Sequence, residues 1–104
     1  MPPGRVAALA DAIRTVAPLD APADVRLHQF FRARKQMGRQ DRAFVAEGVF
    51  AFLRHKRSIE TLAATQDPRR LALATLVREM GKSVREIDAA LSVDEREWLA
   101  AFKS

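Results

Sequence analysis

The sequence of 104 residues contains no cysteine, which excludes disulfides, thiolate metal sites and thiol catalysis and makes a reducing cytoplasm the simplest expected location. Its 48% hydrophobic and 30% charged residues predict one globular domain over residues 1–104, and no apolar run approaches the roughly 18 residues that cross a bilayer. The net charge of +5 arises from residues 26–57, where nine basic residues accompany two acidic ones.

Apolar residues recur at three- and four-residue steps along almost the whole chain and predict an all-α, compact bundle of about six to seven helices. The first helix carries an apolar stripe from Val6 to Val16 and ends before Pro18. The second begins near Pro22, a favourable first-turn residue. We expect this helix to reach Gly38, which would end it as a left-handed cap.

The third helix is predicted from about residue 40 to residue 56 and is apolar on nearly all sides. Such a helix is typically buried, so we expect it to be the central element, with its phenylalanines in the core. Gly48 within it lowers helix propensity and predicts the close approach of another helix. The run from Arg54 to Arg57 would place cations at the negative end of this helix.

The last third of the chain shows strong helix-boundary signals. A short helix carries Ile59 and Leu62, and Asp67-Pro68 predicts the start of the next one. That helix should stop at Gly81. The spacing of Ser83 and Glu86, and again of Ser92 and Glu95, predicts two capping boxes that begin the final helices.

No arrangement of reactive side chains is evident in the sequence. His28 and His55 lack metal-ligand spacing, and the four glycines stand alone rather than in a phosphate-binding loop. Ser83 and Ser92 fit helix caps rather than nucleophiles. We therefore predict a chain that is not itself an enzyme and has no catalytic residues, no metal and no cofactor.

The basic segment supplies the candidate binding residues, because arginine pairs with phosphate and stacks on bases. Two patches are expected, one around Gly38 and a second roughly 22 Å further along the third helix. With the phenylalanines assigned to the core, phosphate contacts should outweigh base readout. Arg42 could equally pair with Glu47 or a neighbouring acid. The candidate RNA-binding residues are Arg32, Arg34, Lys35, Arg39, Arg42, Arg54, Lys56 and Arg57.

Other interpretations of this charge stay open. A basic rim could serve solubility alone, or it could hold an acidic protein partner. A DNA-binding helix-turn-helix over residues 83–102 is disfavoured, because residues 83–104 contain three basic and five acidic residues and would repel phosphate.

Part of the basic segment resembles a known signature. The residues are Phe30-Phe31-Arg32, Met-Gly-Arg-Gln-Asp-Arg-Ala-Phe-Val-Ala-Glu at 37–47, Val49-Phe50 and Leu53-Arg54. They resemble NusB-like domains, and most closely the N-terminal NusB-like domain of bacterial ribosomal RNA cytosine-C5 methyltransferases of the Sun/Fmu type. The resemblance covers residues 5–62 by motif and residues 63–104 by helix count.

The resemblance implies a NusB-like bundle that binds structured RNA, with small-subunit ribosomal RNA as the expected target, or that docks against a C-terminal catalytic domain. It gives Gly38 and Asp41 structural roles and makes Arg39, Arg42, Arg54 and Arg57 the basic positions of the motif. In such methyltransferases the S-adenosylmethionine site and the catalytic cysteines lie in a later domain. This chain would then be the N-terminal part of a longer protein, acting without a metal or a membrane.

Overall fold

The computed structural model describes residues 1–18 and 20–103. These residues form seven α-helices and one 3₁₀ turn and contain no strand, which confirms the predicted all-α bundle. The elements are α1 (Pro3–Val16), α2 (Ala23–Arg32), α3 (Arg39–Arg54), α4 (Lys56–Ala63), α5 (Pro68–Arg78), α6 (Val84–Ile87), η1 (Asp88–Ala90) and α7 (Val93–Lys103).

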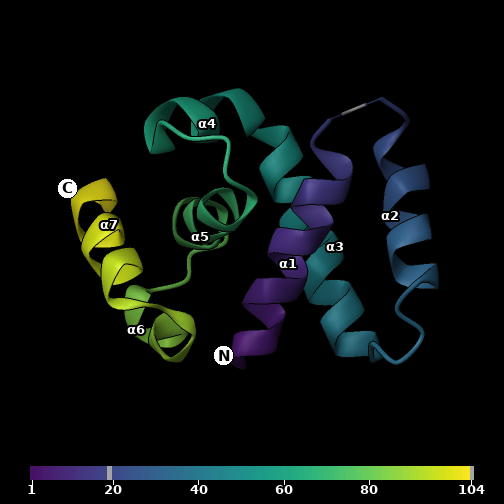
Figure 1. The fold of residues 1–104 in the computed structure, drawn as a ribbon, viewed down its shortest axis with the longest axis horizontal. Helices are drawn as coiled ribbons and strands as arrows, with labels where there is room; N and C mark the ends of the chain where they lie inside the picture. Colours follow the sequence, from purple (N-terminus) through teal and green to yellow (C-terminus); the bar gives the residue numbers. More distant parts are fainter. Residues whose placement is uncertain (19, 104) are drawn as a thin grey trace.

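The centre of the bundle is α5 rather than α3. Figure 1 shows α5 end-on, with α4 above it, α6 and α7 on one side and α1 on the other. Six consecutive residues of α5, Leu71 to Leu76, are buried. The one hydroxyl among them, on Thr75, donates to the carbonyl oxygen of Leu71 at 2.8 Å, which satisfies its hydrogen-bonding need inside the core.

The expectation that α3 is the buried central element is wrong. Helix α3 does pack against α1 and α5, but its outer face is open to solvent, and Phe50 on that face is 42% exposed. Periodicity could not reveal this, because α3 has apolar residues around most of its circumference and only the packing decides which of them is left outside.

The close approach predicted at Gly48 is confirmed. A Cβ atom at Gly48 would lie 2.6 Å from Cδ1 and 3.0 Å from Cδ2 of Leu9 on α1, closer than packed carbon atoms come. Leu9 is fully buried. Because Gly48 has no side chain, the Leu9 side chain of α1 packs directly on the backbone of α3.

Both predicted capping boxes are present. The hydroxyl oxygens of Ser83 and Ser92 accept from the backbone N–H of Glu86 and Glu95, and each carboxylate accepts from the serine N–H in return. The Ser83 backbone N–H is the main cause that lowers the pKa of Glu86. Hydrogen bonding from Arg69, 2.7 Å away, is the main cause that lowers the pKa of Glu95.

The boundaries of α5 also match the expectation. The carboxylate of Asp67 accepts from the Arg70 N–H at 3.0 Å at the start of the helix. Beyond its end, Gly81 has a φ of 68°, the left-handed region that glycine adopts without strain.

The predicted boundary between the second and third helices is wrong. Helix α2 ends at Arg32, and residues 33–38 form a connecting loop. Gly38 has a φ of −74° and a ψ of 170° and stands before α3 in an extended conformation, so it is not a left-handed cap. Backbone turns from Arg34 to Phe31 and from Met37 to Arg34 hold this loop, together with side-chain hydrogen bonds from Arg42 to loop carbonyls, described below.

Candidate nucleic-acid interface

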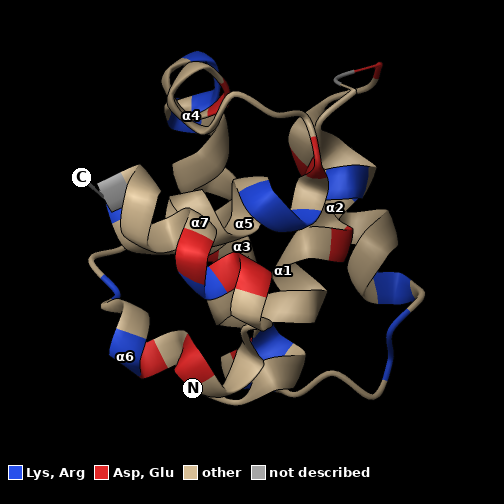
Figure 2. Ribbon diagram, turned by 60° about the vertical axis from the view of Figure 1, so that its left-hand side comes forward, with Lys and Arg blue, Asp and Glu red and all other residues tan. Residues whose placement is uncertain are grey.

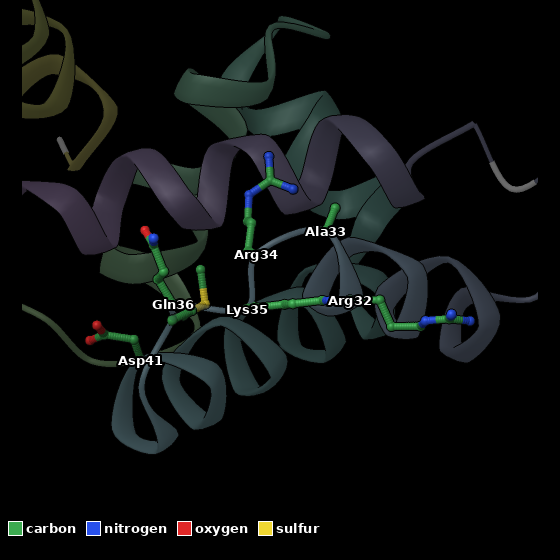
Figure 3. A pocket seen from close by; sticks show the side chains of 7 residues that line it. Arg32, Ala33, Arg34, Lys35, Gln36 and Asp41 are labelled. Carbon is green, nitrogen blue, oxygen red and sulfur yellow. The ribbon is translucent and has the colours of Figure 1, made fainter.

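The loop between α2 and α3 gathers one group of cations. We define Arg32, Lys35 and Arg39 as the loop cluster; all three side chains are exposed. A hollow of about 630 Å³ lies here, lined by residues 32–37 and Asp41. In Figure 3, Arg32 points along α2, away from the loop, whereas Arg34 reaches up toward α1.

Arg34 belongs to the packing of the loop rather than to its outer surface. Its guanidinium carbon lies 3.8 Å from the ring centre of Phe30, and Nη1 donates to the carbonyl oxygen of the same residue at 3.4 Å. Nη2 lies 3.9 Å from Oδ2 of Asp11 on α1. The cation–π contact with Phe30 and the approach to Asp11 give Arg34 partners within the protein.

Arg42 also holds the loop from inside. Its Nε donates to the carbonyl oxygen of Met37 at 2.8 Å and Nη2 donates to that of Arg34 at 3.3 Å. Its guanidinium carbon lies 5.6 Å from the ring centre of Phe31. The partners of Arg42 are therefore carbonyls, and neither Glu47 nor another acid pairs with it among the described residues.

Changing Arg42 to Ala is therefore expected to lower the free energy of unfolding by about 2 kcal/mol, since the loop carbonyls lose a charged donor. Urea unfolding followed by circular dichroism measures this. Arg39→Ala is the matched control, because Arg39 is exposed and should change stability by less than about 0.5 kcal/mol. Equal stability of the two variants would contradict the role assigned to Arg42.

Asp41, the acid that lines the hollow beside the loop cluster, is already paired. Nε of Arg5 on α1 donates to its Oδ1 at 2.6 Å. Sequence patterns do not reveal this ion pair, because its partners stand 36 residues apart. Because Asp41 is the one carboxylate among the described residues that lines this hollow, its pairing with Arg5 leaves it less able to neutralise the loop cluster.

A second group of cations lies where α3 passes into α4. We define Arg54 and Arg57 as the junction cluster; both are exposed. Lys56 differs, since its Nζ lies 3.1 Å from both carboxylate oxygens of Glu60. His55 Nε2 lies 3.2 Å from a carboxylate oxygen of Glu79. A hollow of about 670 Å³ is lined by residues 53–58 and Glu60.

At this junction the negative end of α3 meets the positive start of α4, and only the start of α4 favours an anion. The sequence predicts that the run from Arg54 to Arg57 lies at the negative end of one helix. In the structure only Arg54 lies in the last turn of α3, because α4 begins at Lys56. Lys56 and Arg57 therefore lie in the first turn of α4, which has no acidic residue and no side-chain cap. Cations at the positive end of a helix repel it, and a bound anion would relieve that repulsion.

The structure thus separates the eight candidate residues into two kinds. Three of them, Arg34, Arg42 and Lys56, are engaged by the protein itself. The side chains of the other five have no hydrogen bond, ion pair or ring contact within the described part of the chain; they are Arg32, Lys35, Arg39, Arg54 and Arg57.

The two clusters lie at opposite ends of α3 (Figure 1). This helix has 16 residues, or roughly 24 Å. In Figure 2, acidic residues alternate with basic ones along α6 and α7, while α4 and the loop after α2 are mainly basic. The two clusters therefore lie on the more basic part of the molecule, as a polyanion-binding surface requires.

The fold and these clusters define a small helical domain with a divided basic surface. No protein-family model matches the chain, and neither a curated protein nor a solved structure matches it significantly. Among residues 1–18 and 20–103, no helix combines the length and apolarity needed to span a bilayer. The same residues hold no group of three or more His, Cys, Asp or Glu side chains placed for a metal ion.

Proposed function

We propose that this chain is an RNA-binding domain that contacts backbone phosphates through the loop cluster and the junction cluster. The observation that carries the proposal is that five exposed cations have no acidic partner among the described residues. Guanidinium groups without a partner in the protein are available to phosphate, which they bind through two parallel hydrogen bonds.

RNA is proposed over other polyanions on the strength of the motif. The resemblance of residues 30–54 to NusB-like domains supports structured RNA, with small-subunit ribosomal RNA as the expected target. It also supports a parent methyltransferase whose catalytic cysteines and S-adenosylmethionine site lie outside this chain. A cytoplasmic location goes with this proposal and with the cysteine-free sequence.

Protein docking is the second candidate. Leu62 on α4 is 51% exposed and Val93 on α7 is 64% exposed, and a catalytic domain or an acidic partner could cover them. Each is a single apolar side chain, and single exposed apolar residues are common on monomeric proteins. The basic clusters therefore favour the nucleic-acid proposal.

The salt dependence of binding tests the proposal. With five phosphates neutralised, the logarithm of the association constant should fall with the logarithm of salt concentration with a slope of about −4.5 on duplex RNA and about −3.5 on single strands, by the values for DNA. Fluorescence anisotropy with labelled small-subunit ribosomal RNA fragments at 50–200 mM salt measures it.

Poly-glutamate is the control ligand in the same titration. It carries the negative charge of an acidic protein partner without phosphates or bases. Binding to RNA at least tenfold tighter than to poly-glutamate is expected. No RNA binding at 50 mM salt, or preference for poly-glutamate, would overturn the RNA proposal and favour docking.

A further inference from the structure

Phe50 differs from the other aromatic residues in the described chain. It is 42% exposed, and its ring has no cation or second ring against it among those residues. Each of the others is covered by an arginine, stacked on another ring or fully buried; these are Phe30, Phe31, Phe44, Phe52, Trp98 and Phe102. Phe50 therefore presents a free ring to solvent.

The position of Phe50 on α3 links it to the basic clusters. Residues three and four apart share a helix face, and the exposed row of α3 runs through Arg39, Ala43, Glu47, Phe50 and Arg54. Arg39 belongs to the loop cluster and Arg54 to the junction cluster. The free ring therefore lies on the strip that joins the two clusters, one turn before Arg54.

We propose that Phe50 is a stacking platform for an unpaired RNA base, with Arg54 holding the phosphate beside it. The domain then selects RNA that contains unpaired nucleotides over a continuous duplex. This inference rests on the proposed RNA-binding function and adds the class of RNA. Aromatic rings beside basic side chains are the means by which proteins hold single-stranded nucleic acids.

The surroundings of Phe50 favour a base over a protein surface. Its exposed neighbours along the row are Ala43, the carboxylate of Glu47 and the guanidinium of Arg54. The nearest apolar neighbours of Phe50 on α3, Ala46 and Leu53, are partly buried against the core, so the exposed apolar surface here centres on one ring, whereas protein-binding patches are contiguous over a few hundred Å². A base needs one ring face and one nearby phosphate contact, and this is what the row offers.

Glu47 fixes the side of Phe50 on which the bound phosphate lies. It is exposed and has no ion-pair partner in the described part of the chain, and it stands one turn before Phe50 on the same face. Its carboxylate repels phosphate, so the phosphate next to the stacked base lies on the Arg54 side. Glu47→Gln should raise affinity for single-stranded RNA by roughly threefold at low salt.

The test compares a single-stranded oligonucleotide with a duplex of the same length, each by fluorescence anisotropy. Phe50→Ala should lower affinity for the single strand by roughly 5- to 100-fold and leave affinity for the duplex unchanged. Phe50→Trp should retain single-strand affinity. Val93→Ala is the matched control, since it removes an exposed apolar side chain on α7 and should change neither. Circular dichroism verifies that each variant is folded.

A 2-aminopurine base in the single strand supplies a second readout. Its fluorescence should be quenched on binding the wild-type protein and on binding Phe50→Trp, and much less on binding Phe50→Ala. Equal affinity losses on both RNAs, or none on the single strand, would overturn the stacking role while leaving RNA binding in place. Failure of the wild-type protein to bind either RNA would overturn the proposed function itself.

Discussion

Changing all five cations of the two clusters to glutamine should lower RNA affinity at least roughly 500-fold at 50 mM salt, because a slope of −4.5 corresponds to that factor between 50 and 200 mM. The variant replaces Arg32, Lys35, Arg39, Arg54 and Arg57. It should keep its helicity and unfolding midpoint, because none of these side chains bonds to another described residue. The measurement is an anisotropy titration at several salt concentrations.

Neutralising one cluster at a time shows whether a single RNA spans both. The variant with three changes in the loop cluster should have a slope near −1.8, and the variant with two changes in the junction cluster a slope near −2.7. A double change of Arg78 and Arg85 to Gln is the charge-matched control for the junction variant, since both are exposed and lie outside the clusters. A slope of −4.5 in either cluster variant would show that its cluster does not touch the RNA.

The helix boundaries at the C-terminal side are predictable from the sequence because they depend on residues three positions apart. The capping boxes at Ser83 and Ser92 need only a hydroxyl and a carboxylate at the right spacing. The end of α2 is not predictable in this way. It depends on Arg42, which donates to loop carbonyls five and eight residues earlier, and helical spacing contains no trace of that contact.

The candidate site is predictable in outline for the same kind of reason. Charge counting locates the basic segment, and the 1.5 Å rise of a helix separates it into two patches. Which cations are free is a property of packing: Arg34 and Arg42 lie against Phe30 and Phe31. Helical periodicity also assigns Phe50 to the core, because the apolar residues of α3 surround most of the helix and their spacing cannot tell an outward ring from an inward one.

The packing of Leu9 against Gly48, where α1 crosses α3, predicts a large effect on stability. Leu9→Ala should lower the free energy of unfolding by about 3 kcal/mol, because a fully buried leucine loses its packing and leaves a cavity. Gly48→Ala alone should cost about 1 kcal/mol. Its new methyl group is forced against Leu9, while the gain in helix propensity offsets part of that strain.

Gly48→Ala should have the opposite effect on the free energy of unfolding when Leu9 is also replaced by Ala. Once Leu9→Ala has vacated the space, Gly48→Ala should stabilise by about 1 kcal/mol through helix propensity and partial filling of the cavity. The resulting coupling of about 2 kcal/mol is measured by urea unfolding of all four proteins. Gly4→Ala is the control, since a Cβ there meets nothing within 4 Å and its effect should be the same with and without Leu9. A Gly48→Ala effect independent of Leu9 would mean that the two helices do not meet at this pair, and the position of α3, with both clusters at its ends, would have to be revised.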